Sequence, residues 1–598
     1  MIMWLFYFVL SIGCAAFFTV ASISFYNSNY AQKHRFNLFN ALFAGAFIAS
    51  VLMFYPIHHE TVGGSLTGNA HAALLSVFNA MQIFTIGCDY EIVEASMQAC
   101  PEYLVAAYRI WASVLLVIAP VFTFGFVLSL FKNLSAYANY RFAYFKDAYV
   151  FSELNAKSLA LASDIRANDK HAAIIFTDIF EEEEESGFEL LEEAKQLRAI
   201  CFKNDITVIN FYKHSKKSQI CFFTIGVDET ENLNQSLRLI ERYKTRENTR
   251  LYVFSTSKAS EALLSAADKG AIRVRRINEV RSLINRVLYE DGAQLFTNAV
   301  AAEDGVKDIT AVVIGLGRHG TEMVKALSWF GQMDGYRIEI HAFDKDPLAR
   351  EKLEAIAPEL MSERYNGVAV AGEAQYRICV HAGVDTQTIT FAKEIAQLQK
   401  ATYVLVALGN DEWNVNTALD VRMYFARMGI HPVIQAIVYN SQQKKALQNI
   451  RNFKGQSYDI AFIGDKESSY SREMIMESEL EQTALQRHLK WGKEDDFWNY
   501  EYNYRSSVAS AIHMRARILC GIAAADKRED ELTVAERDAI ETLEHRRWNA
   551  YMRAEGYVYS GSKDPASRND LAKMHHDLVD YASLSEEDKR KDSRVGTK

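Results

Sequence analysis

The sequence predicts a membrane-anchored α/β protein: an α-helical membrane region, then two Rossmann-like α/β domains, then a mainly α-helical carboxyl-terminal domain. Three observations predict this fold class. Apolar character is concentrated before Phe131, and nearly all the charge follows it. From Asp147 onward, apolar strands alternate with helical segments, as in doubly wound parallel sheets. After Arg505 the apolar residues return at helical spacing. We place the regions at 1–135, 147–300, 306–490 and 505–598.

Composition limits the classes of partner. The 598-residue chain has a net charge of -9 and contains a run of glutamates at 181–185. Binding to a nucleic-acid duplex requires clustered Lys and Arg, so we expect no DNA or RNA polymer as a partner and only a small nucleotide as ligand. The 7 cysteines show neither CxxC nor Cys/His spacing, so we expect them to pack and predict no metal site.

Three segments are apolar enough and long enough to cross a membrane, which takes about 20 mostly apolar residues. The segments Ile2–Phe25 and Phe36–Pro56 carry no charge, and Tyr103–Phe131 carries only Arg109. The first has no basic residue ahead of it and is too long for a signal peptide, so we expect it to be a retained anchor.

The positive charges predict the orientation of these segments. Lys33 and Arg35 lie in the first link, Lys132 follows the third segment, and no Lys or Arg occurs at 58–102. Cytoplasmic loops carry an excess of Lys and Arg. We therefore expect a multi-pass protein with its amino terminus outside and everything after Phe131 in the cytoplasm.

The outside stretch, at about 71–93, is a candidate re-entrant loop. His71–Phe84 has helical apolar spacing but is too short to span a membrane, which suits a pore helix. The next residues resemble the filter of potassium channels, where Thr-x-Gly-x-Gly-Asp follows a pore helix and backbone carbonyls replace the ion's water. The candidate pore residues are Thr85, Ile86, Gly87, Cys88 and Asp89.

This stretch departs from the potassium pattern because an acid replaces the second glycine, so strict potassium selectivity is not expected. Asp89, Glu91 and Glu94 have no compensating base nearby. Several copies around an axis would form a ring that attracts cations. The alternative is an acidic loop that only keeps the outside surface soluble, and the sequence leaves both open.

The clearest local motif is a glycine loop between an apolar run at 309–314 and a helical segment at 321–330, followed by a second strand that ends in an acid. It fits the GxGxxG loop of dinucleotide-binding units, in which the acid binds ribose. The predicted nucleotide-binding residues are Gly315, Gly317, Gly320 and Asp344. NAD or another nucleotide is the expected ligand, and the alternative is a tight turn without one.

A second copy of this unit lies upstream. The segment 148–165 matches strand, turn and helix, and 224–234 echoes 407–416, each after an apolar strand. The three glycine positions of the upstream copy hold Ser152, Leu154 and Lys157. We interpret the two copies as a divergent tandem pair in which only the second keeps a phosphate-binding loop.

Membrane helices with a pore-like loop and tandem Rossmann units resemble ligand-gated cation channels with cytoplasmic RCK (TrkA-N type) domains. The likeness covers about 147–490. It implies Rossmann units that pair into gating rings, and so a homo-tetramer or another homo-oligomer.

The carboxyl-terminal region contains a predicted helix from near Ser506 and another that Thr533 is expected to cap. The stretches 543–561 and 575–592 resemble the RyR domain, the repeat first known from ryanodine receptors and found singly in bacterial proteins. The matching positions are Glu544, His545, Trp548, Gly556, Tyr557, Tyr559, Gly561, His576, Leu578, Val579, Tyr581, Leu584 and Lys589.

In bacteria such modules are associated with defence systems that signal through modified nucleotides, so this resemblance implies a nucleotide sensor. Aromatic faces would stack on a base and basic side chains would hold phosphates. The predicted nucleotide-binding residues are Arg546, Arg547, Trp548, Tyr557, Tyr559, His576, Tyr581 and Lys589. The alternative is that the aromatic residues are structural and the bases form a solvated face.

Together these features predict a nucleotide-gated ion channel of the bacterial inner (plasma) membrane, and the resemblance implies a role in antiviral defence. One alternative is a housekeeping potassium channel or transport regulator that senses NAD or ATP at the glycine loop. The other is a membrane-anchored NAD-dependent enzyme. No substrate domain with a His or Tyr acid is evident, so we expect no catalytic residues and no enzyme activity.

Overall fold

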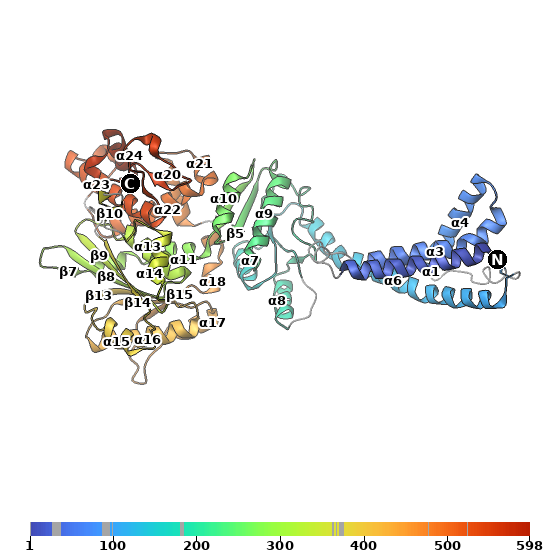
Figure 1. The fold of residues 1–598 in the computed structure, drawn as a ribbon. Coiled ribbons are helices and arrows are strands. Elements are labelled where there is room, and N and C mark those ends of the chain that lie inside the picture. Colours follow the sequence, from blue (N-terminus) through green and yellow to red (C-terminus); the bar gives the residue numbers. More distant parts are fainter. Residues whose placement is uncertain are drawn as a thin grey trace. The chain divides into compact units, whose positions relative to one another are not determined.

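The computed structural model describes residues 2–26, 38–85, 96–97, 100–179, 185–361, 364–365, 368–369, 376–476, 478–522 and 524–597. The chain forms two compact units, Met1–Phe142 and Ala143–Lys598. The smaller unit is helical, and the larger unit contains two parallel sheets and a helical carboxyl-terminal region (Figure 1).

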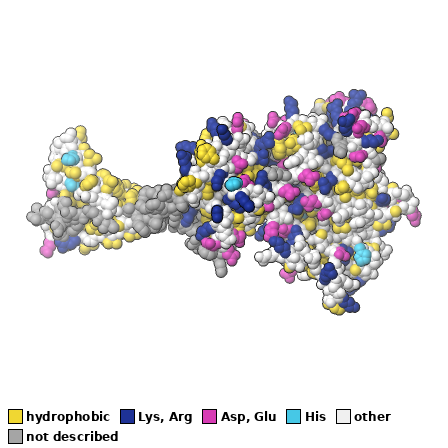
Figure 2. Space-filling model, turned by 180° about the vertical axis from the view of Figure 1, so that it is seen from behind, with side chains coloured by type: hydrophobic (Ala, Val, Ile, Leu, Met, Phe, Trp, Pro, Cys, Tyr) yellow, Lys and Arg dark blue, Asp and Glu magenta, His cyan; other side chains and the backbone are white. Residues whose placement is uncertain are grey.

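The helices of the smaller unit are α1 (Ile2–Tyr26), α3 (Leu38–Val62), α4 (Leu66–Phe84) and α6 (Glu102–Phe142). Among the described residues, three helical segments are long enough and apolar enough to cross a membrane: Ile2–Ser22, Leu42–Val62 and Glu102–Val121. They overlap the three predicted segments. On the face in Figure 2, the described part of this unit carries mostly hydrophobic and uncharged side chains, whereas charges of both signs cover the larger unit.

The predicted pore helix is part of α4. Ser65 caps the helix by accepting a hydrogen bond from the backbone N–H of Gly68, and Thr85 follows its last turn. Because the hydroxyl of Ser65 satisfies one of the amides that a helix start leaves open, the helix begins well before the predicted His71. The other four candidate pore residues, 86–89, lie outside the described residues.

The first sheet has the strand order β3-β2-β1-β4-β5-β6, and every pair is parallel. Its strands are β1 (Ala148–Phe151), β2 (Ala173–Phe176), β3 (Ile200–Cys201), β4 (Ile220–Thr224), β5 (Thr249–Phe254) and β6 (Arg273–Ile277). Its helices are α7 (Ala156–Asn168), α8 (Glu185–Gln196), α9 (Glu229–Tyr243) and α10 (Lys258–Ala266). The central strands are continuous buried apolar runs, as expected where helices cover both faces.

The second sheet repeats this topology in the order β12-β9-β8-β13-β14-β15, with β7 (Val300–Ala301) antiparallel to β8. Its other strands are β8 (Lys307–Ile314), β9 (Tyr336–Asp344), β12 (Tyr376–Ala382), β13 (Ala401–Val406), β14 (Val433–Ile437) and β15 (Ile460–Ile463). Its helices include α13 (Arg318–Phe330), α14 (Ala349–Ile356), α15 (Ile389–Ile395), α16 (Asp411–Arg427) and α17 (Ser441–Leu447). Counted within each sheet, both orders are 3-2-1-4-5-6, that of dinucleotide-binding folds. The predicted pair of Rossmann-like parallel sheets is confirmed.

The two sheets share a pair of equivalent hydrogen bonds. The side chain of Asn232 accepts from the backbone N–H of Gly226 and donates to the carbonyl of Phe254, at 2.7 and 3.0 Å. The side chain of Asn414 accepts from the N–H of Leu408 and donates to the carbonyl of Ile437, at 2.6 and 2.8 Å. Each asparagine ties a loop to the end of the next strand, which explains why the sequence repeats around it.

The carboxyl-terminal helices share a core with the second sheet. They are α20 (Glu479–His488), α21 (Glu494–Asn499), α22 (Glu501–Leu519), α23 (Val534–Ala554) and α24 (Glu586–Gly596), with a short parallel pair, β16 (Val558–Tyr559) and β17 (Met574–His575). Thr533 caps α23 through a reciprocal pair of bonds with Glu536, as predicted. In Figure 1, α11 (Glu279–Glu290) and α13 lie on the face of the sheet toward α22 and α23, and α15 and α16 lie on the other.

Candidate functional site

A cavity of about 630 Å³ opens at the carboxyl ends of the strands of the second sheet. Gly315 follows β8, Asp344 ends β9, Leu408 follows β13, and Tyr439 follows β14. In open α/β sheets, ligands bind where neighbouring strands send their connections to opposite faces, which here is between β8 and β13. The volume lies within the range of about 300–1,000 Å³ typical of small-molecule sites.

The structure gives a different reason for glycine at each of the three predicted positions. Gly315 has a φ of +93°, and a Cβ there would lie 2.6 Å from the carbonyl oxygen of Ala407. A Cβ on Gly320 would lie 1.7 Å from the carbonyl oxygen of Gly315, so a side chain would push α13 off the strand. Gly317 has a φ of -66°, and a Cβ there would meet nothing within 4 Å. The fold therefore requires the first and third glycines but not the second, whose missing side chain leaves open space in the cavity.

Asp344 supports the glycine loop from the end of β9. Its two carboxylate oxygens accept hydrogen bonds from the backbone N–H groups of Leu316 and Asp346, at 2.6 and 2.8 Å. Each carboxylate oxygen has a second lone pair. The side chain also lines the cavity, so it can accept a hydrogen bond from a ribose hydroxyl without releasing the loop.

The first turn of α13 lacks a side-chain cap, because its N-cap residue is Gly317. The equivalent helix of the first sheet, α7, is capped: Asn155 accepts from the N–H groups of Lys157 and Ser158, both at 3.0 Å. Open N–H groups at a helix start bind phosphate. Of these two equivalent helices, α13 is therefore the one whose first backbone N–H groups can bind an anion.

Residues near the first sheet close the other side of the cavity. Lys157, which replaces the third glycine of the upstream copy, lines it together with Glu279 and Tyr470. The Nζ of Lys157 lies 2.9 Å from a carboxylate oxygen of Glu279, and the hydroxyl of Tyr470 donates to the other carboxylate oxygen at 2.6 Å. The glycine loop of one copy thus faces the corresponding position of the other.

The remaining lining side chains are cationic and aromatic as well as apolar. Lys345 lies with its Nζ 5.1 Å from the ring centroid of Trp413, which is 48% exposed at the rim. Burial and the neighbouring Arg318 lower the pKa of His319, so its ring is neutral near pH 7 and lies 3.4 Å from the hydroxyl of Tyr439. Cations with uncapped amides suit phosphates, and the rings suit a base.

The RyR-like residues do not line this cavity. Arg547 is 1% exposed, with its Nη2 2.7 Å from a carboxylate oxygen of Glu544 on the same helix. Arg546 is also buried, and its Nη2 lies 3.0 Å from a carboxylate oxygen of Asp334, beyond the end of α13. Both guanidinium groups are engaged inside the fold.

The predicted aromatic residues are mostly buried as well. The backbone N–H of Tyr559 donates to Glu359 at 3.0 Å, and the hydroxyl of Tyr557 donates to Asp570 at 3.3 Å. The hydroxyl of Tyr581 donates to Glu541 at 2.7 Å. Trp548 is half-buried, with its ring centroid 4.9 Å from that of His575.

Two predicted residues lie near the end of the chain. The Nε2 of His576 is 3.3 Å from a carboxylate oxygen of Asp577. Lys589 pairs with Glu586 at 2.9 Å and lies with its Nζ 5.2 Å from the ring centroid of Tyr581. The eight RyR-like positions are thus distributed around α23 and its neighbours, and nucleotide binding by them stays a prediction.

Several lining residues were not predicted from the sequence. Lys345 and Trp413 had a local signal, because one directly follows the ribose-binding acid and the other lies in the repeated motif after β13. Glu279 and Tyr470 had none, since they reach the cavity only through the packing of the two sheets.

No family model matches the chain. No protein with a curated description is similar enough to it to count as a relative.

Proposed function

We propose that the chain is a membrane protein whose larger unit binds a small nucleotide in the glycine-loop cavity. The observation that carries this proposal is Gly317. A loop kept only as a tight turn accounts for Gly315 and Gly320 but not for a glycine that has ordinary backbone angles and open space around it. A ligand that approaches the backbone at this position accounts for all three.

The chemistry of the cavity supports this ligand class. A phosphate would accept hydrogen bonds from the uncapped amides of α13, with Arg318 and Lys466 adding positive charge. Asp344 would accept from a ribose hydroxyl. Since this is the site of the housekeeping alternative, NAD and ATP are the first ligands to test. A signalling nucleotide at Trp548 is the second candidate, supported by the partial exposure of that ring.

Binding at this loop would reach the rest of the unit through α13. Glu322 and Lys325 on α13 pair with Arg281 of α11 and Glu555 at the end of α23, at 2.7 and 3.7 Å. A ligand shifts a conformational equilibrium only by its difference in affinity for the two states. Closure of the cavity over a nucleotide would supply that difference, and α13 would carry it to the carboxyl-terminal helices.

The smaller unit would act as the effector. Its three apolar helices would span the inner membrane with the amino terminus outside, and the stretch from Thr85 to Asp89 would form a cation path around the axis of a homo-oligomer. The absence of Lys and Arg at 58–102 supports both the orientation and the attraction of cations. Nucleotide binding would open this path.

The test is ligand-induced stabilisation of the detergent-purified, full-length protein. Thermal unfolding is measured with NAD, ATP, ADP-ribose and cyclic oligonucleotides, because a ligand at a hundred times its dissociation constant adds about 2.7 kcal/mol. Gly317→Val fills the open space and is expected to abolish the shift, while its own cost at the helix start is about 1 kcal/mol or less.

Two further variants locate the site. Ala259→Val, which places a valine on an exposed position of α10 outside the cavity, is the control and should retain the full shift. Trp548→Phe should retain it too. A shift that survives Gly317→Val and disappears in Trp548→Phe would move the sensor to the RyR-like region. Turnover of NAD by the purified protein would instead favour the enzyme alternative.

A further inference from the structure

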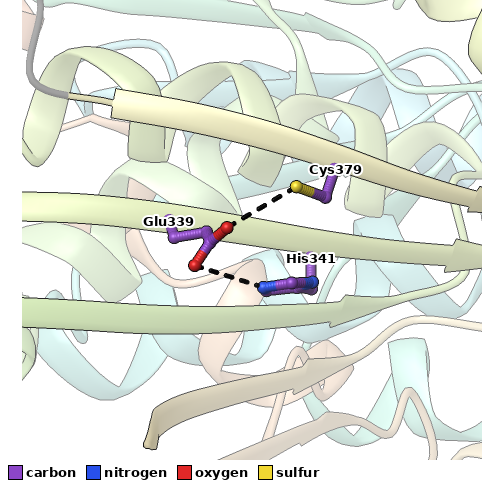
Figure 3. A group of neighbouring side chains, drawn as sticks. All are labelled: Glu339, His341 and Cys379. Carbon is purple, nitrogen blue, oxygen red and sulfur yellow. Dashed lines mark hydrogen bonds and ion pairs between the residues drawn. The ribbon is translucent and has the colours of Figure 1, made fainter. Parts of the chain in front are cut away.

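A mixed group of metal-binding side chains lies on one face of the second sheet, between β9 and the edge strand β12 (Figure 3). Glu339 and His341 alternate along β9 and therefore share a face. Cys379 lies on β12 directly opposite His341 in the parallel register. One ligand atom from each of the three residues, a carboxylate oxygen, a ring nitrogen and the sulfur, lies within 4.8 Å of the others.

The spacing of these atoms fits one shared ion. The Nε2 of His341 lies 3.6 Å from one carboxylate oxygen of Glu339, and the Sγ of Cys379 lies 3.7 Å from the other. Bonds of about 2.0–2.3 Å at tetrahedral angles would separate such ligand atoms by about 3.3–3.5 Å. The two measured distances run to different oxygens of Glu339 and exceed this separation by a few tenths of an ångström. A rotation of the carboxylate, with small shifts of the other two side chains from their present spacing of at most 4.8 Å, would place one ligand atom of each residue around a single ion.

A hydrogen-bonded relay orients the ring of His341. Its Nδ1 lies 3.0 Å from the Nε2 of His381, and the Nδ1 of His381 lies 2.6 Å from a carboxylate oxygen of Glu394 on α15. A carboxylate only accepts, so His381 donates to it from Nδ1 and accepts at Nε2 from His341. This assignment leaves the lone pair of the Nε2 of His341 facing Glu339, as in histidines that bind metals.

We propose that Glu339, His341 and Cys379 bind one Zn²⁺ ion, with His381 and Glu394 as the residues that position His341. A set of thiolate, imidazole and carboxylate suits Zn²⁺, whereas Mg²⁺ and Ca²⁺ prefer oxygen ligands alone. The three protein ligands leave a fourth position open to water, and the side chain of Glu339 is 39% exposed. The ion would cross-link β9 to β12, whose carboxyl ends carry Asp344 and Val384 of the cavity wall.

The described residues contain another such group, His575, His576 and Asp577, and it is less suitable. These three are consecutive in the chain, and the Nδ1 of His575 already accepts a hydrogen bond from the backbone N–H of Asp577 at 3.1 Å. It provides a built-in comparison for the test.

The experiment is Zn²⁺ titration of the full-length, chelator-stripped protein in competition with a chromophoric chelator. The expected result is one tightly bound ion per chain, with an affinity at least 100-fold lower in Cys379→Ser and in Glu339→Gln. Glu394→Gln touches no metal and should lower the affinity about 10- to 100-fold through the orientation of His341. Cys201→Ser, in the first sheet, is the matched control and should bind as the wild type does.

Co²⁺ gives an independent readout, because a thiolate ligand produces a sulfur-to-cobalt charge-transfer band. The band should appear in the wild-type protein, persist in Glu394→Gln and vanish in Cys379→Ser. Absence of a stoichiometric ion, equal affinity in wild type and Cys379→Ser, or loss of binding in His576→Asn alone would each overturn the proposal. The result does not depend on whether a nucleotide binds the neighbouring cavity.

Discussion

Glu555 lies just after α23, where three cations surround its carboxylate. The distances from its oxygens are 3.0 Å to Arg281, 3.7 Å to Lys325 and 3.3 Å to Arg505. Burial alone would raise the pKa of Glu555, but Arg281 and Arg505 outweigh it and hold the pKa below its ordinary range. The group therefore stays charged near neutral pH and joins three helices through one side chain.

Glu555→Gln should be strongly destabilising, because it removes the buried negative charge that balances the positive charges of Arg281, Lys325 and Arg505. Loss of one partner from a buried ion pair typically costs about 3–5 kcal/mol. The measurement is urea unfolding followed by tryptophan fluorescence, in which the midpoint should fall. Glu354→Gln removes an exposed pair with Arg350 on α14 and is the control. Equal midpoints for the two variants would contradict the structural role of Glu555.

At the scale of elements, local sequence patterns were sufficient to predict the strands and the helix that form the glycine loop of the second Rossmann-like sheet. The apolar run at 309–314, the glycine loop and the acid at 344 predicted β8, α13 and the end of β9, because each depends on neighbours in sequence. That Lys157 and Glu279 lie opposite this loop could not be predicted from the sequence, because their position depends on how the two sheets pack. The proposed zinc site was not predictable for a similar reason: its ligands come from β9 and β12, which are paired in the sheet but separated in the sequence by α14.

The carboxyl-terminal helices show that a sequence motif does not determine which partners its charged residues contact. The sequence predicted α23 and its cap correctly, and it predicted that the basic residues on this helix face a ligand. In the structure Arg546 pairs with Asp334, and Arg547 pairs with Glu544. A sequence pattern specifies which residues lie on one helix, but not whether an acid pairs with them, either from the same helix, as for Arg547, or from elsewhere in the fold, as for Arg546. Their role in ligand binding stays a prediction.

Helix α22 carries a buried histidine that should make the larger unit sensitive to acid. His513 donates from Nε2 to the carbonyl of Gln332 at 2.6 Å. Burial, with the neighbouring Arg517 and Arg547, lowers its pKa well below the ordinary value of 6.5. Below pH 6.5 the unfolded chain binds a proton that the folded chain does not, so stability falls as the pH decreases.

The expected result is a loss of unfolding free energy between about pH 7 and 5 that is reduced in His513→Gln. The two proteins should differ in how steeply the free energy of unfolding changes with pH. This difference should approach about 1.4 kcal/mol per pH unit, which corresponds to one proton taken up on unfolding. The measurement is urea unfolding across this pH range. Unfolding at pH 8 serves as the control, because the ring of His513 is neutral there in both the folded and the unfolded chain. Parallel slopes for the two proteins would show that His513 does not titrate in this way.

At the scale of the whole molecule, the proposed function requires communication between two compact units. The larger unit supplies a cavity whose walls come from both sheets, and the smaller unit supplies three helices able to cross a membrane. Helix α6 is continuous from Glu102 to Phe142 and ends where the larger unit begins. It is therefore the covalent route by which a change in the larger unit would reach the membrane.

The measurement that tests the central claim most directly is cation flux in vesicles that contain the full-length protein and the nucleotide found by thermal unfolding. Wild type and Gly317→Val are compared, because the substitution blocks the cavity and leaves the membrane unit unchanged. The expected result is a nucleotide-dependent rise in flux in the wild type and none in Gly317→Val. Flux that is equal in the two proteins, or a wild type that binds the nucleotide without conducting, would contradict gating of a cation path from the glycine loop.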